Sequence, residues 1–503
     1  MEGGNIVGIL EVLSVSEALE ANGFYHDNQD VFTAIDDDSL RALSPSSPFG
    51  SSQVSVSIRE SGHTELSNAC KRTQRHGDQH SKLTTSVQNL IYPLYSGQVA
   101  SVGRCPDLNN ISVNHPATSS VHFMIWSVMF DPSSTPILYL RDNSLNGVFV
   151  NDHRLGRYNS VVLSEGDIIE IKCALKFCVR LYEDKTESQK SAAFYLPTST
   201  IDSWSISNKV IGFGSFGAVF IAKRRHTAKS YAVKVIRQNA SYTDKRRSKL
   251  KDEAEMLQTI SHPNIIKVHK AYYFDDYIYL FEDLICGGDL FSYLAKDSHL
   301  RSIPESETII IVYQLLLALE YLHNNLKIIH RDLKLDNVLL EAPLPCSRVI
   351  LCDFGIAKPL KCLNERSNTV VGTIEYSAPE IFQKGRLEDK SKSMFIDCSP
   401  GGYDYKCDIW SLGVMIHIML SGISPFYSNG QEKTIIHSAK LGRLSFSGSA
   451  WANVSYCAKD FVKSLIKVNP EERFSINDCL AHEWIEKHLD QLRLIYSSKI
   501  LKE

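Results

Sequence analysis

Residues 330–337 read H-R-D-L-K-L-D-N, and residues 353–355 read D-F-G. The first stretch offers a carboxylate that can act as a base (Asp332), a cation that can face a phosphate (Lys334) and an amide that can ligate a metal (Asn337). Mg2+ prefers such hard oxygen ligands. H-R-D alone is weak evidence. The interpretation therefore depends on whether the other parts of a phosphoryl-transfer site lie where that chemistry needs them.

A glycine-rich segment lies upstream, at 212–219, and reads G-F-G-S-F-G-A-V. Glycine lets a backbone fold close over phosphates, where a Cβ would collide. The same G-x-G-x-x-G spacing also opens Rossmann helices. The run at 220–223 has no helical period, which favours a strand, a tight turn and a returning strand.

The segment 231–234 reads Y-A-V-K, an apolar strand that ends in Lys234. On its own such a lysine could snorkel at the surface. The segment resembles the V-A-I-K motif, and that resemblance implies that Lys234 reaches the α- and β-phosphates. The charged stretch 244–260 has a helical pattern with Glu253 on its apolar face. We predict that Glu253 pairs with Lys234; its rival, Glu255, would point away from this face.

In this order the segments resemble the signature set of protein kinases, which A-P-E at 378–380 completes. The resemblance implies a two-lobed α+β protein kinase domain at 204–486, with an insert at about 385–402. It also implies an ATP-dependent enzyme that uses Mg2+.

The resemblance gives each polar residue of the site a role. Asp332 would orient the hydroxyl of the substrate and Lys334 would lie beside the transferring phosphate, as catalytic residues. Asn337 and Asp353 would hold Mg2+. Catalysis of this kind is mostly positioning and charge neutralisation. The residues expected to surround ATP are Val210, Ile211, Gly212, Phe213, Gly214, Ser215, Phe216, Gly217, Ala218, Val219, Ala232, Lys234, Glu253, Asp283 and Ile285.

An apolar strand at 277–281 leads into E-D-L-I-C-G-G at 282–288. Counting back from the Gly-Gly turn, the backbone from Asp283 to Ile285 is expected to hydrogen-bond adenine. Glu282 would then be the gatekeeper, and its long polar side chain would narrow access behind the adenine.

The catalytic stretch also predicts the acceptor and the mode of activation. Lys334, two residues after Asp332, favours serine or threonine over tyrosine. Arg331 predicts that the site is activated by a phosphate on the activation loop, because a phosphate adds a negative charge that arginine can pair with. Thr369 is the best acceptor there. Thr373 is the second candidate, at a position that more often holds a structural hydroxyl.

Two acidic residues predict the preferred substrate. Asp289 and Asp336 stand where basophilic kinases face an arginine three residues before the acceptor, so we predict a preference for Arg-x-x-Ser/Thr. The alternatives are helix capping for Asp289 and a solvated loop charge for Asp336.

Short strands separated by turns fill residues 83–183, which predicts an all-β sandwich before the kinase domain. The expected strands lie at 122–130, 136–140, 147–150, 167–171 and 177–181.

Three loop signals in this sandwich, G-R, S-x-x-H and D-x-S-x-N-G, resemble a forkhead-associated (FHA) domain. The resemblance implies that Arg104 and Ser119 hold the phosphate of a phosphothreonine and that Asn146 holds the peptide backbone. Ser120 and Val148 depart from the pattern, which commonly has arginine and threonine there.

The remaining segments are assigned by composition. Residues 1–23 are expected to hold the first strand of the FHA domain, because 5–14 are strand-like. Polar composition predicts a disordered insertion at 24–82 and a linker at 184–203. The tail at 487–503 predicts a short amphipathic helix against the large lobe.

Composition agrees with these assignments. The net charge of the 503 residues is −3, so no basic field calls for direct nucleic-acid binding. Twelve cysteines, without paired metal spacing, suit reduced thiols. We expect no apolar run of membrane-spanning length, no secretory start and no membrane partner.

An FHA domain joined to a serine/threonine kinase is typical of the checkpoint kinase two-like group. Within it, G-G-D-L-F-S-Y-L at 287–294 and T-V-V-G-T at 369–373 resemble the meiosis-specific kinases of budding yeasts. This implies nuclear, chromosome-associated work in meiotic recombination and its checkpoint, with break repair biased toward the homologous chromosome. It also implies recruitment by a phosphothreonine-containing chromosome axis protein, and transient self-association for autophosphorylation in trans on Thr369. A mitotic DNA-damage checkpoint kinase and an inactive phosphothreonine-binding scaffold are the alternatives.

Overall fold

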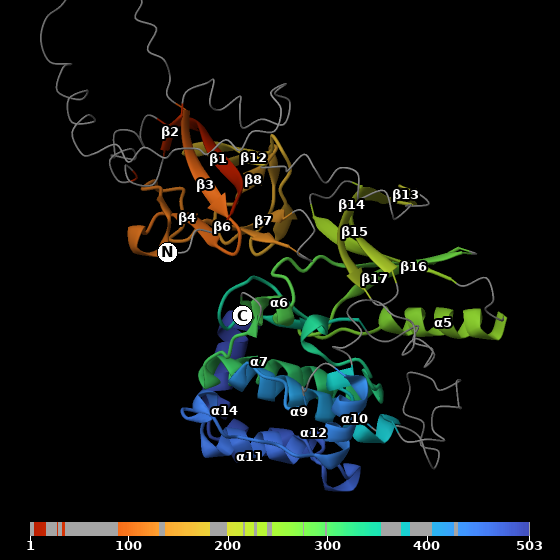
Figure 1. Cartoon of the computed structure of the whole chain (residues 1–503). Helices are drawn as coiled ribbons and strands as arrows, with labels where there is room; N and C mark the ends of the chain where they lie inside the picture. The colour runs from red at the N-terminus through yellow and green to blue at the C-terminus, as the bar shows by residue number, and fades with distance from the viewer. Residues whose placement is uncertain are drawn as a thin grey trace, which may run out of the picture.

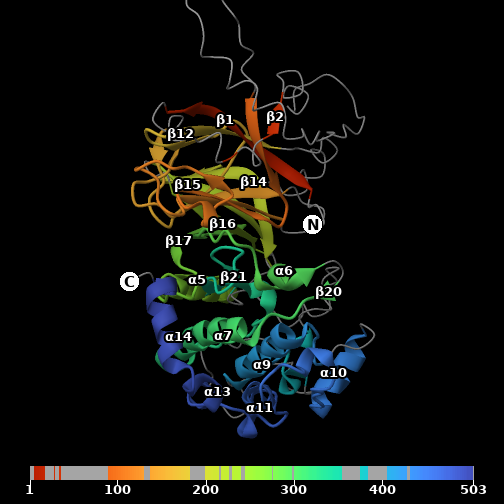
Figure 2. The same ribbon diagram turned by 90° about the vertical axis from the view of Figure 1, so that its left-hand side faces the viewer.

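The computed structural model describes residues 5–16, 28, 33–35, 89–129, 136–181, 199–214, 217–225, 229–238, 244–274, 276–296, 299–353, 374–382, 405–426 and 431–501. They form a β-sandwich, a small lobe built on one sheet and a large helical lobe (Figure 1). The sandwich and the small lobe both lie above the large lobe (Figures 1 and 2).

Two sheets form the sandwich, with the strand orders β2-β3-β1-β12-β11-β8-β9 and β10-β7-β6-β4-β5. One apolar core lies between them. The strands of the first sheet are β1 Ile6–Val15, β2 Thr33–Ile35, β3 Asn89–Tyr95, β8 Phe149–Val150, β9 His153–Arg154, β11 Ile168–Ile171 and β12 Leu175–Leu181. Those of the second are β4 Val99–Gly103, β5 Ile111–Ser112, β6 Phe123–Val128, β7 Ile137–Asp142 and β10 Ser160–Val162.

Strand β1 places an N-terminal segment, residues 6–15, in the sandwich. β1 lies between β3 and β12 and is antiparallel to both. The disordered insertion predicted from residue 24 begins too early, because β2 pairs with β3. Asn28 is also buried, and its Nδ2 donates to the carbonyl oxygen of Ser112 while its Oδ1 accepts from the Ser112 N–H, both at 2.7 Å. A single side chain that satisfies an edge strand leaves no pattern in the sequence; the rest of 24–82 lies outside the described residues.

Strand β7 of the five-stranded sheet is buried on both faces. Every residue of β7 is buried. Leu138 and Leu140 belong to the sandwich core, whereas Ile137 and Tyr139 lie in a second apolar cluster with residues of the small lobe. A strand covered on both sides has a continuous apolar run rather than an alternating one, as I-L-Y-L does.

The sheet of the small lobe has the strand order β13-β14-β15-β16-β18-β17. β14 and β15 are antiparallel neighbours across the glycine-rich turn, so the Rossmann alternative, which needs a helix there, is excluded. β13 pairs with β14, so the sheet begins inside the predicted linker. The elements are β13 Thr200–Ile201, β14 Trp204–Gly214, β15 Gly217–Arg224, β16 Ser230–Arg237, α5 Asp244–Leu257, β17 Val268–Tyr273 and β18 Tyr277–Asp283.

Two buried helices, α7 Glu305–Glu320 and α9 Lys406–Ser421, form the centre of the large lobe. Their apolar core extends to Ala254 and Leu257 of α5. The other elements are α6 Leu290–Leu294, β19 Ala295–Lys296, β20 His299–Leu300, β21 Val338–Leu340, β22 Val349–Leu351, α10 Glu432–Leu441, α11 Tyr456–Leu465, α12 Ile476–Leu480, α13 Glu483–Glu486 and α14 Leu489–Ile495.

Among the described residues, Glu305–Leu326 is long and apolar enough, by length and composition alone, to cross a membrane. The expectation that no run reaches this length was wrong. In the structure 61% of the apolar window is buried inside the protein, because the segment is α7 with the turn that follows it, at the centre of the large lobe.

The tail packs on the large lobe through α14 and a helical turn, Tyr496–Leu501. Leu492 and Ile500 are buried. The hydroxyl of Tyr496 donates to Oδ1 of Asn264 at 2.6 Å, which ties the end of the chain to the segment between α5 and β17.

Candidate active site

The segment 330–337 is held from helix α9. The backbone N–H groups of His330 and Arg331 donate to the carboxylate of Asp408, at 2.8 and 2.9 Å, and Nε2 of His323 lies 2.9 Å from the same carboxylate. Burial alone would raise the pKa of Asp408, but its bonds to His323 and His330 hold that pKa below its usual value. The loop therefore rests on a buried anion, which holds Arg331 in a left-handed conformation (φ 69°).

Asp332, Lys334 and Asn337 come together in this loop. Nδ2 of Asn337 donates to the carbonyl oxygen of Asp332 at 2.6 Å and to its carboxylate Oδ2 at 3.2 Å. Nζ of Lys334 lies 3.8 Å from the same Oδ2. Asp332 and Asn337 are each only 4% exposed. A carboxylate, a cation and an amide are thus held in one small, largely dry space, as phosphoryl transfer requires.

Asp353 joins this group through β22 and the residue that follows it. The Cys352 N–H donates to the carbonyl oxygen of Asn337 at 2.9 Å, and Asp353 forms an ion pair with Lys234 on β16. Burial lowers the pKa of Lys234, against the attraction of Glu282. Lys234, which is expected to face the phosphates, and the D-F-G aspartate therefore contact each other. The rest of D-F-G lies outside the described residues.

The described part of the glycine-rich segment leaves no room for a side chain at Gly217, where a Cβ would collide with the carbonyl oxygen of Val235. Val219 is paired with Lys234 across β15 and β16, so their side chains share the face that also carries Ala232. Val210 and Ala218 pack in a cluster on the other face of the sheet, because side chains alternate along a strand. Ser215 and Phe216 lie outside the described residues.

Helix α5 carries the two glutamates proposed as partners of Lys234. Glu255 points to solvent, where its Oε1 lies 3.9 Å from Nζ of Lys251 and its side chain is 54% exposed. Ala254 and Leu257 are buried in the core. Glu253 lies in α5, and its side chain is outside the described part of the chain.

The hinge follows β18. Burial alone would raise the pKa of Asp283, but hydrogen bonds from His269 (2.9 Å) and Lys229 (3.1 Å) lower it below its usual value. Glu282 is paired with Ala232 across the sheet. Burial raises the pKa of Glu282, against the attraction of Lys234.

Asp289 caps helix α6. Its Oδ1 accepts from the Ser292 N–H at 2.7 Å, and its Oδ2 accepts from the Ser292 hydroxyl at 2.9 Å, as the capping alternative predicts. Burial raises the pKa of Asp289, and repulsion from Asp336 raises it further. The two carboxylates predicted to face a substrate arginine are therefore close enough to repel each other.

The end of the activation segment is anchored in the large lobe. Glu380 accepts two hydrogen bonds from the guanidinium group of Arg473, at 2.7 and 3.1 Å. Thr369, Thr373 and the predicted insert at about 385–402 lie outside the described residues.

The three residues assigned to phosphothreonine lie on neighbouring loops of the sandwich. The Arg104 N–H donates to the carbonyl oxygen of Ser119 at 2.8 Å, and the Ser119 hydroxyl accepts from the Leu145 N–H at 3.0 Å. Nδ2 of Asn146 donates to the carbonyl oxygen of Ala117 at 2.9 Å. Arg104 and Asn146 are exposed, so an anion can reach them from solvent.

Two buried side chains support these loops. The carboxylate of Asp142 accepts from the N–H groups of Ser144 and Val148, at 2.8 and 3.2 Å. Nδ1 of His122 accepts from the Ser119 N–H at 3.0 Å, and burial lowers the pKa of His122. A neutral His122 therefore keeps its acceptor at neutral pH.

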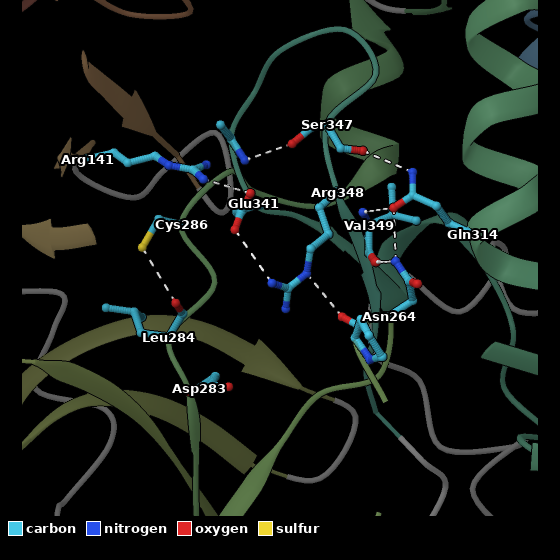
Figure 3. A network of polar contacts seen from close by, with 12 residues as sticks. Arg141, Asn264, Asp283, Leu284, Cys286, Gln314, Glu341, Ser347, Arg348 and Val349 are labelled. Carbon is cyan, nitrogen blue, oxygen red and sulfur yellow. Dashed lines mark hydrogen bonds and ion pairs between the residues drawn. The ribbon is translucent and has the colours of Figure 1, made fainter. Parts of the chain in front are cut away.

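Sequence reasoning missed the residues that join the FHA sandwich to the kinase lobes. Nη2 of Arg141 lies 2.8 Å from Oε2 of Glu341 (Figure 3). The indole N–H of Trp126 donates to the carbonyl oxygen of Cys286 at 2.8 Å. The available signal was the unbroken apolar run of β7, which indicates a strand covered on both faces.

Comparisons with known proteins identify both domains. The protein kinase domain model matches residues 206–485, and the FHA domain model matches residues 100–172. The chain is 42% identical over 429 residues to the meiosis-specific serine/threonine-protein kinase MEK1 of Saccharomyces cerevisiae, across 81% of this chain and 85% of that protein. It is 36% identical over 409 residues to mek1 of Schizosaccharomyces pombe, across 80% and 84%. The crystal structure of Rad53 1-466 in complex with AMP-PNP aligns with 27% identity and a TM-score of 0.46, over 77% of this chain and 91% of that one.

The fold and the site define a serine/threonine protein kinase that carries an FHA domain and uses ATP. The chain belongs to the family of meiosis-specific serine/threonine-protein kinases.

Proposed function

We propose that this kinase acts in meiotic recombination and its checkpoint, in the nucleus and on chromosomes, where it biases break repair toward the homologous chromosome. The grouping of Asp332, Lys334 and Asn337 with the Lys234–Asp353 pair supports phosphoryl transfer. The similarity to two meiosis-specific kinases supports the setting.

In the proposed chemistry Asp332 orients the hydroxyl of the substrate, and Lys334 places a positive charge beside the transferring phosphate. Asn337 and Asp353 present an amide oxygen and a carboxylate, a donor set that fits Mg2+. When bound there, Mg2+ would neutralise charge on the phosphates. Lys234, held 5% exposed on β16, would bind the phosphates from the small lobe.

Phosphate transfer by Asp332→Ala tests this proposal. The variant should fall to background while it still binds nucleotide, because Asp332 acts on the acceptor and not on ATP. Asp490→Ala, which changes an exposed acid on α14, should retain full transfer. Equal and negligible incorporation by the wild type and Asp332→Ala would favour the inactive scaffold.

The FHA domain is proposed to recruit the kinase to a phosphothreonine on a chromosome axis protein. Arg104→Ala should abolish binding of a phosphothreonine peptide, because it removes the cation of the site, and should leave turnover of a short free substrate unchanged. Lys172→Ala, in the turn between β11 and β12, is the control. Retained binding by Arg104→Ala would refute the assignment.

A preference for Arg-x-x-Ser/Thr is supported by the mutual repulsion of Asp289 and Asp336, which an arginine of the substrate would relieve. Asp289→Asn separates this role from capping, because asparagine caps a helix as well as aspartate does. It should lower kcat/KM for a peptide with arginine at position −3 and leave the −3 alanine peptide unchanged. An equal effect on both peptides would leave capping as the role of Asp289.

Activation is proposed to follow autophosphorylation in trans on Thr369, because capture of several chains raises their effective concentration. Active kinase mixed with an Asp332→Ala chain should place phosphate on Thr369 of the inactive chain. The mitotic checkpoint alternative is tested by protein levels through meiosis and after mitotic DNA damage. Induction by damage alone would favour that alternative.

A further inference from the structure

The FHA domain lies against the hinge and the nucleotide side of the small lobe. Trp126 on β6 bonds the carbonyl oxygen of Cys286 in the hinge. Arg141 on β7 pairs with Glu341 (Figure 3), the residue that follows β21. Strand β10 lies against β16, the strand that carries Lys234. Three strands of one FHA sheet thus contact the hinge, the residue after β21 and the strand that carries Lys234.

One apolar cluster spans the two domains. Its buried members are Trp126, Val128, Ile137 and Tyr139 of the FHA domain, and Ile211, Ile221, Ala232, Cys286 and Ala342 of the kinase domain. Val219 and Leu284 pack against it. Ile211, Val219 and Ala232 are among the residues assigned to ATP, yet Ile211 is only 4% exposed. Protein therefore already covers apolar surface that is expected to line the nucleotide site.

The FHA sheet carries apolar residues on the face that contacts the kinase domain. Phe123 and Ile125 of β6 face the sandwich core, while Trp126 and Val128 face the kinase domain. The face of a sandwich that meets water normally carries polar residues, and a large apolar patch marks an interaction surface. The side chain of Arg141 is 7% exposed and places its charge 2.8 Å from Glu341, so loss of Glu341 would leave a buried cation without its counter-ion.

We propose that the docked FHA domain closes the adenine side of the nucleotide site, so that docking and nucleotide binding exclude each other. The proposal rests on the nucleotide-binding residues assigned to the small lobe and the hinge. The apparent affinity for nucleotide is the intrinsic affinity scaled by the undocked fraction. Arg104 and Asn146 remain exposed in the docked chain. The FHA domain can therefore bind a phosphothreonine before it undocks from the nucleotide site.

Nucleotide affinity measured on full-length chains tests the proposal. Arg141→Glu opposes Glu341 with a like charge and should tighten binding of a fluorescent ADP analogue by roughly tenfold or more. Trp126→Phe keeps an apolar ring but loses the bond to Cys286, and should act in the same direction. The pair Arg141→Glu/Glu341→Arg should restore weak binding in part, since Arg348 lies 3.6 Å from Glu341. Lys172→Glu, a similar charge change in the turn between β11 and β12, should have no effect.

Thiol labelling gives a readout that is independent of nucleotide. Cys286 is 2% exposed under Trp126, and burial raises the pKa of its thiol to about 12, so the docked chain should resist alkylation there. Alkylation of Cys286 should become faster in Arg141→Glu. Cys479, buried in the large lobe, should stay protected and so report that the kinase remains folded. Binding of a phosphothreonine peptide reports the same for the FHA domain.

The outcomes separate the inference from the assigned nucleotide site. Equal nucleotide affinity in the wild type, Arg141→Glu and Trp126→Phe, with Cys286 labelled faster in the variants, would show that undocking does not open the site and would overturn the proposal. Unchanged labelling and affinity would overturn the docking contact itself. Failure of every variant to bind nucleotide would overturn the assigned nucleotide site and the inference with it.

Discussion

Arg473 and Glu380 form a two-point ion pair in which the arginine side chain is fully buried. The same guanidinium donates to the carbonyl oxygens of Lys406 and Lys467. One side chain thus joins the end of the activation segment to the start of α9 and to the segment after α11.

Arg473→Met should destabilise the large lobe by about 3–5 kcal/mol, because it leaves Glu380 buried without its cation. Urea unfolding measures the loss. The double variant Arg473→Met/Glu380→Gln removes the orphaned charge, so it should lose less than Arg473→Met alone. A free energy of unfolding for Arg473→Met equal to that of the wild type would contradict the role assigned to the pair.

Asp408→Asn should lower kcat by about 100-fold, because the catalytic loop loses its buried anion and small displacements in an active site have effects of this size. The KM for ATP should change little, since Asp408 bonds the backbone of the loop and not the small lobe. Steady-state kinetics on a peptide substrate give both constants. Asp460→Asn, at a half-buried acid of α11 that lies 3.5 Å from His482, is the control, and equal kcat values for the two variants would refute the prediction.

Glu282→Gly should admit purine inhibitors with bulky substituents and lower their inhibition constants at least about tenfold, as the filling of an apolar pocket typically does. Glu282→Gln keeps the length of the side chain and should remain resistant. Unchanged inhibition of the glycine variant would show that Glu282 does not stand behind the adenine.

His262 should make stability depend on pH. Burial, with repulsion from Arg348, lowers the pKa of His262 to about 4, and its Nδ1 accepts from the Asn264 N–H at 3.1 Å. In the unfolded chain a histidine has a pKa of about 6.5. Between these two pH values the unfolded chain binds more protons than the folded chain. The contribution of His262 to the free energy of unfolding is therefore fully present above pH of about 6.5 and is lost as the pH falls toward about 4.

The urea midpoints of the wild type and His262→Gln at several pH values measure this contribution. The variant should lose less stability than the wild type between pH of about 6.5 and 4. His299→Gln, at an exposed histidine of β20, should follow the wild type. Parallel curves for the wild type and His262→Gln would count against the assignment.

Most of the residues assigned to catalysis could be predicted from short local motifs. The segment 330–337, Lys234 and Asp353 stand in an order and spacing that few other sites use, and the structure brings them together. The sandwich strands also followed from short apolar runs between turns, because alternation and turn residues act over a few neighbours. The lengths of β6 and β7 differ from the expected runs only at their ends.

By itself, then, the sequence determined the two domains and the polar residues that are expected to form the phosphoryl-transfer site, because each motif encodes a local backbone shape and a fixed set of charges. Tertiary structure alone decided which surface covers which. The apolar residues of β7 could have faced the sandwich core, solvent or a partner, and only packing assigned Tyr139 to the kinase domain. Likewise, Arg141 and Glu341 are 200 residues apart, and a single pair at that separation leaves no local pattern from which to predict it.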